Sequence, residues 1–497
     1  MSKKKFLEAL EHARNGRFEE ALAVLRTLER GFVRRRLAHY KAQPDQREAA
    51  FRLQTAFDVL APARTAEPAA RAPRSPAFAA PLPPANVATA PRSPIHFDNP
   101  EDLLAWASGD WDRAPPLDLD ECRYVDVWAL VALGSLRLAE RPRRPPMLPT
   151  GQSGASRFAH ALGLNALAGG GEPGKDEPDR TVRLTRVQKA SEIERTADRM
   201  ASLIVTSPDA FDMRLAIRYV LVELLRNVLQ HSQDPLGAVA AAQRMDTSTW
   251  HSGNMIQLAV ADAGIGIPRS LHRAHPHLTD YRQALERALL PHISGTFEEG
   301  LTGSFENAGL GLYMISEMAR QTGGRLLVAT TGAALVLQRG DGVTPATPRF
   351  LQPPGAGFPG TLVAFEIPTD AVQDYHSLIQ TLLRKANERT PKRAFGRWLS
   401  FEAVPGEAER AALFEQRENT PAAMELSRTR LAPAIVARRP VELDFARIEL
   451  CTQSWLHALL FEPIRLAWAL RVPIHIVNAD PAVREGLRFL EAYALGG

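Results

Sequence analysis

The chain has 497 residues, 45% of them hydrophobic and 23% charged, and a formal net charge of +4 at pH 7. A chain of this length and ordinary composition is expected to form roughly three globular domains. No apolar run approaches the ~18 residues of a membrane span, and Met1 to Phe6 lack the apolar region of a signal peptide. We therefore expect a cytoplasmic protein without a membrane segment.

The cysteines and the basic residues do not indicate a metal site, a disulfide framework or a nucleic-acid surface. Cys122 and Cys451 are far apart in the chain, and neither has a partner at metal-ligand spacing. The one dense basic run, Arg34 to Arg36, lies in a helical pattern, where a solvent-facing surface is the simpler interpretation. Nucleic acid binding is not supported by the sequence, although it is not excluded.

The first 60 residues have the apolar spacing of two helices. Phe6 and Leu10 are followed, after a break at Gly16, by Leu22 at helical spacing. This helical hairpin is similar to one tetratricopeptide unit, but a single unit cannot bury its own apolar face, so a plain helical appendage is an equally good interpretation. The Ala- and Pro-rich stretch that follows predicts a linker over residues 61–95.

Two small α/β units with the same plan are predicted, one on each side of the central region. Each has the order strand, helix, strand, helix. In a gapless alignment Leu119 coincides with Leu443 and Asp120 with Asp444, which indicates an internal repeat. The predicted elements are strands at 116–120 and 146–148 with helices at 125–138 and 156–164, and strands at 440–444 and 472–477 with helices at 455–470 and 482–493.

The C-terminal unit resembles a STAS-like domain, the class to which anti-anti-sigma factors belong. The resemblance lies in the strand pattern at 441–444 and in the turn at Thr452-Gln-Ser454 that follows it. In that family the turn carries a regulatory Ser or Thr. Two interpretations of the Thr452 and Ser454 hydroxyls remain, regulatory modification and capping of the helix that follows. Capping is favoured. The N-terminal unit has Trp128 at the matching place, so we expect that unit to be structural.

A glycine-rich stretch separates the first unit from the central region. Gly169 to Lys175 satisfies the G-x-x-x-x-G-K pattern, but Asp176 stands where a phosphate-binding loop has Ser or Thr. Prolines on both sides of Lys175 also exclude the strand and the helix that such a loop needs. We interpret residues 169–180 as a second linker.

The central region contains three motifs, the first of which lies on a helix predicted over 212–230. Glu223 and Asn227 are four residues apart on this helix and therefore share a face, next to a run of Leu and Val. A pair on the solvent-facing edge of an amphipathic helix would have the same spacing. The first motif alone therefore does not distinguish a site from a surface.

The second and third motifs are rich in glycine. Asp262 to Pro268, with glycines at 264 and 266, follows a strand predicted over 255–261, and Asn307 to Leu312, with glycines at 309 and 311, opens a helix. Glycine lets the backbone approach a ligand closely, and a helix N-terminus favours an anion. The other predicted elements are strands at 181–187, 326–329, 334–337 and 362–367 and helices at 191–204, 281–290 and 312–320.

In order and spacing these motifs resemble the GHKL ATPase superfamily, which includes gyrase-type topoisomerases, Hsp90 chaperones, MutL proteins and the ATP-binding domains of histidine kinases. The resemblance implies ATP and Mg²⁺ as cofactors. It implies a multi-domain α/β protein with a central Bergerat-fold α/β sandwich, whose mixed sheet has helices on one face. The predicted organisation is a helical hairpin (1–60), a linker (61–95), a STAS-like domain (96–168), a linker (169–180), the GHKL ATP-binding domain (181–370), and a connecting helix with a C-terminal STAS-like domain (371–497).

The resemblance also implies roles for individual residues. Glu223 is the implied catalytic base that deprotonates the attacking water, and Asn227 is the implied Mg²⁺ ligand. Asp262 is implied to accept a hydrogen bond from the adenine amino group, and the stretch 294–304 is interpreted as an ATP lid. The implied nucleotide-binding residues are Asn227, His231, Asp262, Gly264, Gly266, Ile267, Gly309, Leu310, Gly311, Leu312 and Thr361.

Three functions follow as hypotheses. The leading one is Mg²⁺-dependent ATP hydrolysis as a nucleotide-controlled switch for a partner protein, in bacterial signalling or antiviral defence. The alternatives are a serine/threonine kinase of the anti-sigma type, acting on a STAS-domain protein, and a non-catalytic nucleotide-binding scaffold. Gln230, which stands where the family usually has Lys, disfavours the kinase, and Glu223 disfavours the scaffold. We expect a protein partner, leave a homodimer open, and expect no membrane partner.

Overall fold

The computed structural model divides the chain into two compact units. The larger unit comprises residues 75–389 and the short segment 450–454, and the smaller unit comprises residues 1–74, 390–449 and 455–497. The structure describes residues 2–15, 17–28, 32–33, 36–37, 40, 49–50, 52–53, 57, 94–109, 117–139, 152–167, 169, 180–247, 253–273, 275, 278–291, 293, 310–338, 348–351, 357–388, 398–404 and 406–496.

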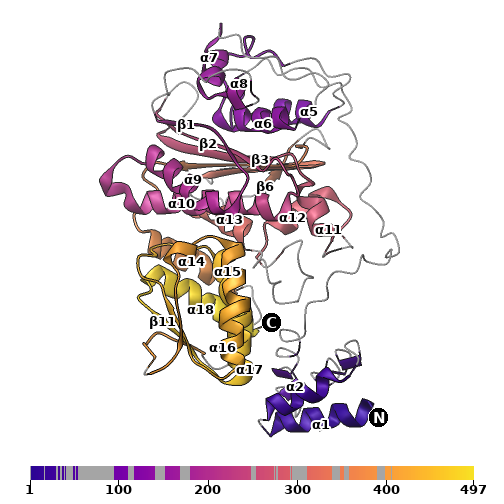
Figure 1. Ribbon diagram of the computed structural model, residues 1–497. Coiled ribbons are helices and arrows are strands. Elements are labelled where there is room, and N and C mark those ends of the chain that lie inside the picture. Colours follow the sequence, from indigo (N-terminus) through magenta and orange to yellow (C-terminus); the bar gives the residue numbers. More distant parts are fainter. Residues whose placement is uncertain are drawn as a thin grey trace. The chain divides into compact units, whose positions relative to one another are not determined.

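A seven-stranded sheet in the order β1-β2-β3-β7-β4-β5-β6 forms the centre of the larger unit (Figure 1). Every pair of neighbouring strands is antiparallel. All eight residues of β3 are buried, because both faces of the sheet are covered. The strands are β1 Thr181–Val187, β2 Ala238–Met245, β3 Met255–Asp262, β4 Arg325–Thr330, β5 Ala333–Leu337, β6 Pro348–Phe350 and β7 Thr361–Pro368.

Helices cover one face of this sheet, below the strands in Figure 1. The longest, α10, buries 14 of its 21 residues, and α14 packs on α10 and α13. We call this side of the sheet the α10 face. Its helices are α9 Ala190–Ile204, α10 Phe211–His231, α11 Gly266–His272, α12 Tyr281–Ala288, α13 Gly311–Gln321 and α14 Tyr375–Glu388, with a short 3₁₀ turn at Pro208–Ala210.

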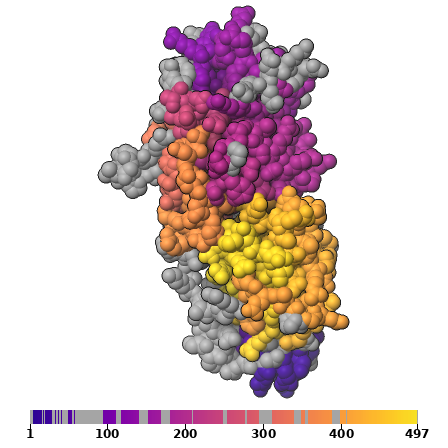
Figure 2. Space-filling model, turned by 90° about the vertical axis from the view of Figure 1, so that its left-hand side faces the viewer, coloured from indigo at the N-terminus to yellow at the C-terminus, as the bar shows by residue number. Residues whose placement is uncertain are grey.

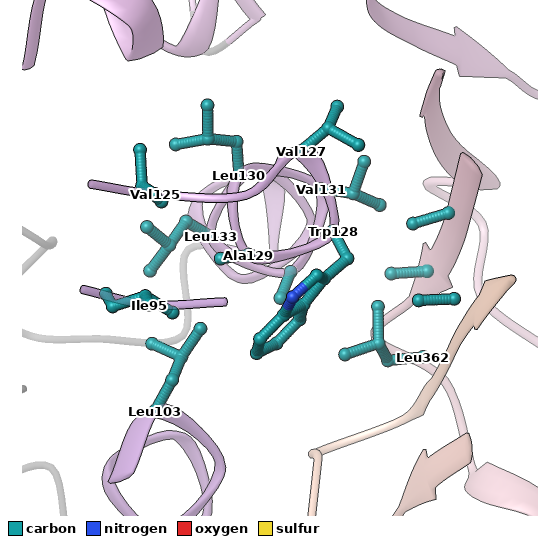
Figure 3. Packing of buried hydrophobic residues seen from close by; sticks show 14 of the residues in the cluster. Ile95, Leu103, Val125, Val127, Trp128, Ala129, Leu130, Val131, Leu133 and Leu362 are labelled. Atoms are coloured by element: carbon teal, nitrogen blue, oxygen red, sulfur yellow. The ribbon is translucent and has the colours of Figure 1, made fainter. Parts of the chain in front are cut away.

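The opposite face, called the α6 face below, is covered by the segment that precedes β1 (Figure 1). Helix α6 buries ten of its twelve residues, because it packs on β1, β2 and β3 and also on α8. Trp128 of α6 points toward the strands, where Leu362 of β7 is a neighbour (Figure 3). In the space-filling view this purple segment and the magenta elements beside it are closely packed (Figure 2). The helices are α5 Glu101–Ser108, α6 Val127–Leu138, α7 Gly154–Ala161 and α8 Leu164–Leu167.

A buried polar network also joins the α6 face to the sheet. Arg325 of β4 donates two hydrogen bonds to Glu366 Oε1 of β7, at 2.8 Å from Nε and 2.6 Å from Nη2. Gln257 of β3 donates to Glu366 Oε2 at 3.2 Å and accepts from the backbone N–H of Trp128 at 3.3 Å. Burial raises the pKa of Glu366, and the Arg325 charge opposes this rise. The network fixes the start of α6 over the centre of the sheet.

The α/β sandwich is confirmed, with two corrections to its description. The sheet is antiparallel throughout rather than mixed, and helices cover both of its faces rather than one. Strand β2 was not predicted because it is dominated by alanine, which has a low strand propensity. The predicted strands and helices between residues 181 and 370 are present, with ends that differ by one or two residues.

One strand prediction before the sheet is wrong. Residues 117–120 form a turn in place of the predicted strand at 116–120. Leu117 and Leu119 are both buried, but the carboxylate of Asp118 accepts a hydrogen bond from the N–H of Asp120 at 2.8 Å and closes the turn. The alternation of apolar residues therefore comes from a turn. The strand predicted at 146–148 lies outside the described residues, and the helix predicted at 125–138 is present as α6.

The smaller unit contains a four-stranded sheet in the order β8-β11-β10-β9, with all pairs parallel. The strands and helices predicted between 440 and 493 are present, and α17 begins two residues earlier than expected. The N-terminal helices α1 and α2 pack against each other, as the hairpin predicts. The elements are α1 Ser2–Arg14, α2 Phe18–Arg26, β8 Leu399–Ser400, β9 Glu409–Ala412, η2 Phe414–Gln416, α15 Thr420–Leu426, a π-turn Ser427–Leu431, α16 Ala432–Val436, β10 Val441–Asp444, α17 Gln453–Leu470, β11 Ile474–Val477 and α18 Pro481–Gly496.

Candidate functional site

A pocket lies on the α10 face of the larger unit, with about 820 Å³ of empty space when the open solvent at its mouth is included. Its walls come from α10, the ends of β3 and β7, α11 and the start of α13, and much of the wall is apolar, as in small-molecule sites generally. The pocket brings together residues from all the predicted motifs. Those that line it are Asn227, His231, Asp262, Gly266, Ile267, Gly311, Leu312 and Thr361.

Helix α10 carries Glu223 into the interior of the unit. The Glu223 side chain has 0% of its surface exposed, which excludes the alternative that this residue lies on a solvent-facing edge. A buried carboxylate is costly unless it is hydrogen-bonded or paired. One turn further along the helix, Asn227 lines the pocket. The two residues therefore occupy adjacent levels of one helix, and Asn227 is the one that faces the cavity.

Gly311, the first residue of α13, lies directly beside this pair. A Cβ built on Gly311 would be 2.6 Å from Glu223 Oε2 and 3.3 Å from Asn227 Nδ2, so a side chain here would collide with the carboxylate. The first backbone N–H groups of a helix have no partner within the helix, and the helix dipole favours an anion near them. Because Gly311 and Leu312 line the pocket, this helix start is suited to phosphate oxygens.

Asp262, the last residue of β3, also lines the pocket. It is 2% exposed, and its Oδ1 atom accepts a hydrogen bond from the N–H of Gly264 at 2.8 Å. Across the strand pair Asp262 is opposite Thr361, the first residue of β7. A carboxylate in this place can accept a hydrogen bond from the amino group of a base inserted between the two strands' ends and α11.

The loop after Asp262 requires glycine at two places. A Cβ on Gly264 would lie 2.1 Å from the carbonyl oxygen of Ser232, because the loop packs on the end of α10. Gly266 has a φ of +75°, and a Cβ there would lie 2.7 Å from Thr330 Oγ1. Gly264, Gly266 and Gly311 therefore mark places of close backbone approach.

Thr330, the last residue of β4, is a site residue that the sequence did not indicate. Its hydroxyl accepts a hydrogen bond from the N–H of Ile267 at 2.9 Å and donates to the carbonyl of Gly360 at 2.9 Å. It thus joins the start of α11 to the turn before β7 and holds two walls of the pocket together. A single Thr at the end of a strand gives no recognisable sequence signal, so only the fold identifies it.

His231 lies at the C-terminal end of α10 and lines the pocket. Its side chain keeps some exposed surface, but the surrounding protein desolvates the ring and lowers its pKa to about 4, with a further contribution from the positive charge of Arg273. The imidazole is therefore neutral at pH 7. A neutral ring can donate one hydrogen bond and accept another.

The short segment Leu450–Ser454, whose last two residues begin α17, belongs to the larger unit and contacts Glu223 through Ser454. Ser454 Oγ donates a hydrogen bond to Glu223 Oε2 at 3.0 Å. Arg226 Nη1 donates to Glu223 Oε1 at 3.4 Å and also donates to Thr452 Oγ1. The sequence singled out Thr452 and Ser454 but did not predict that they meet Glu223, and it did not predict Arg226.

Four of the predicted features remain to be placed. Gly309 and the lid predicted over 294–304 lie outside the described residues. Leu310 is buried just before α13 and accepts a hydrogen bond from the N–H of Met314 at 2.9 Å, so it shapes the helix start without lining the pocket. Thr452 immediately precedes α17, and the capping interpretation of its hydroxyl stays a prediction.

Comparison with known families identifies the class of this domain. Residues 213–369 match the family described as "Histidine kinase-, DNA gyrase B-, and HSP90-like ATPase". This part of the chain is therefore a GHKL-type ATPase domain, and the family supports ATP binding by it. No curated protein and no solved structure matches the chain. Among the residues that the structure describes, none of the helices is both long and apolar enough to cross a membrane.

Proposed function

We propose that the domain binds Mg²⁺ and ATP in this pocket and hydrolyses the nucleotide, with Glu223 as the general base. The observation that carries the proposal is the position of Glu223: a fully buried carboxylate lies at the start of α13, next to a pocket that ends at a second buried carboxylate, Asp262. Buried carboxylates at a cavity are costly for stability and are typical of functional sites.

In this proposal, different residues of the pocket contact the adenine and the phosphate groups of the nucleotide. At the adenine end, Asp262 accepts a hydrogen bond from the amino group, and the loop held by Thr330 forms the wall beside the base. At the phosphate end, the N-terminus of α13 faces the anionic oxygens. His231, neutral at pH 7, lies on the same helix as Asn227 and can hydrogen-bond the nucleotide as donor or acceptor.

The residues at the phosphate end fit a magnesium ion. Magnesium is usually held by one or two protein oxygens, with water and phosphate oxygens in the other positions. Asn227 supplies one amide oxygen at the pocket wall, and within the described part of the chain no cluster of three or more His, Cys, Asp or Glu side chains offers a complete protein cage. When bound, the ion would neutralise charge on the phosphate groups.

In the chemical step, Glu223 accepts a proton from water as the water oxygen forms a bond to the γ-phosphorus. The bond from the γ-phosphorus to the β,γ-bridging oxygen breaks, and ADP leaves with that oxygen. A positioned general base contributes about 10²–10⁴-fold to such a rate. Glu223 has one carboxylate oxygen beside Gly311, where the γ-phosphate of a bound nucleotide would meet α13.

The wider role that we propose is a nucleotide-controlled switch for a protein partner. The support for this role is limited to the chain's organisation, in which the ATPase domain is combined with a unit that contains a four-stranded parallel sheet and resembles a STAS-like domain in sequence.

A second function, a serine/threonine kinase, is favoured by one specific observation. The hydroxyl of Ser454 is hydrogen-bonded to Glu223, so a base and a possible acceptor hydroxyl are already in contact. Gln230 argues against this function because the family usually has a Lys there, which would contact phosphate. Water is therefore the nucleophile in the proposal, and Ser454 is treated as the competing acceptor in its test.

The test follows both fates of the γ-phosphate in one reaction. Purified protein with Mg²⁺ and ATP is expected to release free phosphate in step with ADP, and intact-mass spectrometry is expected to show no stoichiometric gain of a phosphoryl group. The Asp262→Asn protein, purified identically, serves as the control for a contaminating ATPase. A stoichiometric phosphoryl group on Ser454 or Thr452 would instead establish the kinase function.

A further inference from the structure

We propose that the segment Leu450–Ser454 is an inhibitory element that occupies the catalytic base. The inference rests on the proposed function, in which Glu223 must accept a proton from water. In this arrangement the hydroxyl of Ser454 takes the place at Glu223 that the attacking water needs. The segment therefore controls hydrolysis, while the nucleotide pocket stays open.

The choice of carboxylate oxygen is the first observation behind this proposal. Oε2 of Glu223 is the oxygen nearest to Gly311, at the start of α13, and it is the oxygen to which Ser454 donates at 3.0 Å. Glu223 and Ser454 are 0% and 1% exposed, so bulk water does not compete freely for this contact. A water molecule that is to donate its proton to Oε2 must first displace the Ser454 hydroxyl.

Arg226 fixes the segment in this position. It lies three residues after Glu223 on α10, is 1% exposed, and donates to both Glu223 Oε1 and Thr452 Oγ1. The same guanidinium thus neutralises the buried carboxylate and holds the inhibitory segment. Since Arg226 belongs to α10 itself, Glu223 keeps its ionic partner when the segment leaves, and the base remains charged and ready to act.

The proposed inhibition acts on turnover and leaves binding intact. Neither Thr452 nor Ser454 lines the pocket, whereas Asn227 and Asp262 do. Loss of the Ser454 contact should therefore raise kcat and leave the affinity for ATP unchanged. Residues 449 and 455, which flank the segment in the chain, belong to the smaller unit. The chain therefore passes from the smaller unit into the larger one at Leu450 and returns after Ser454.

The decisive variant is Ser454→Ala, which removes the hydroxyl and leaves room for water. We expect kcat for phosphate release to rise about tenfold, equivalent to about 1.4 kcal/mol in the barrier, with the KM and the calorimetric Kd for ATP unchanged. Ser135→Ala is the matched control, because Ser135 is a buried serine of α6 on the other face of the sheet. It should leave both constants at the wild-type values.

A second pair of variants tests the hydrogen bond from Arg226 to Thr452, which holds the segment in place. These variants also cover the case in which Ser454→Ala does not fold. Thr452→Val removes the oxygen that accepts from Arg226 while keeping the side-chain shape, and it should raise kcat by a smaller factor. Thr452→Ser keeps the hydroxyl and should turn over at the wild-type rate. Thermal melting of all variants establishes that the proteins compared are folded.

The outcomes separate this inference from the proposed function. If the wild type binds and hydrolyses ATP but folded Ser454→Ala and Thr452→Val are no faster, the inhibitory role is wrong and the ATPase stands. If Ser454 acquires a phosphoryl group during turnover of the wild type, Ser454 is an acceptor and the inhibitory role is also overturned. Absence of ATP binding in both the wild type and the variants would overturn the proposed function together with the inference.

Discussion

The two faces of the seven-stranded sheet differ most clearly at the end of β3 and the start of β7. Alternate residues of β3 and β7 point to opposite faces, so Ala261 and Leu362 join the apolar core on the α6 face. Their neighbours Asp262 and Thr361 line the pocket on the α10 face. Two neighbouring residues of each strand therefore have different roles, because one packs in the apolar core and the next lines the pocket.

This difference shows how the domain combines stability with a polar site. On the α6 face, the burial of large apolar side chains such as Trp128 provides stability, at about 25 cal/mol per Å² of apolar surface. On the α10 face, the buried charges of Glu223, Arg226 and Asp262 reduce that gain, because desolvated charges are costly even when paired. We expect substitutions on the α6 face to change the free energy of unfolding, and substitutions at the pocket on the α10 face to change ATP binding.

The largest effect on stability is expected from Trp128→Ala on the α6 face. The indole is fully buried between α6 and the strands, and its removal leaves a cavity, so the free energy of unfolding should fall by about 3–5 kcal/mol. The measurement is denaturant unfolding of the wild type and the variant. The folded fraction of Trp128→Ala should still bind ATP with the wild-type affinity, because the pocket lies on the other face.

Trp128→Phe is the control for this prediction, because it keeps an aromatic ring in the same place and should lose less stability. The separation of the two faces would be contradicted if Trp128→Ala weakened ATP binding in protein that calorimetry or circular dichroism shows to be folded. It would also be contradicted if the variant unfolded at the wild-type denaturant concentration.

A smaller free-energy effect, confined to binding, is expected from Asp262→Asn on the α10 face. The amide presents a donor where the carboxylate offers an acceptor to the adenine amino group, and an unmade buried hydrogen bond costs roughly 1–3 kcal/mol. The Kd for ATP, measured by calorimetry, should rise by the corresponding factor of about 5–150. The thermal midpoint of the nucleotide-free protein should change little.

The matched substitution is Asp246→Asn. Asp246 follows β2 at the surface, where it forms an exposed ion pair with Arg180 and takes no part in the pocket. It should leave the affinity for ATP unchanged, since exposed pairs contribute little. An unaltered Kd in Asp262→Asn would mean that the base of the nucleotide does not lie at this carboxylate.

The sequence predicted the parts of the fold that have strong local patterns. Helix α10, strand β3 and helix α13 have regular local patterns, and glycines mark the loop after β3 and the first residue of α13, so the central ATP-binding fold was recognisable. The strand expected at 116–120 failed because Asp118 closes a turn with the same apolar alternation that a strand would have. Local pattern alone cannot distinguish these two structures.

The contacts that connect distant parts of the chain were not predictable in the same way. Ser454 and Glu223 are 231 residues apart, and Arg226 and Thr452 are 226 apart, so neither pairing leaves a signal in local spacing. The covering of the α6 face by α6 and α8 was missed for the same reason, because it depends on which surface the apolar helix α6 packs against. Such pairings come from tertiary packing.

The central claim is that Glu223 is the base of an ATPase, and the most direct measurement compares Glu223→Gln with the wild type for both ATP binding and phosphate release. The amide keeps the shape of the side chain, and its single carbonyl oxygen can still accept a hydrogen bond from Arg226 or from Ser454, but it cannot take a proton from water. The account predicts that the variant binds ATP with the wild-type Kd and releases phosphate about 10²–10⁴-fold more slowly. Wild-type turnover by Glu223→Gln would remove Glu223 from the mechanism and contradict the account.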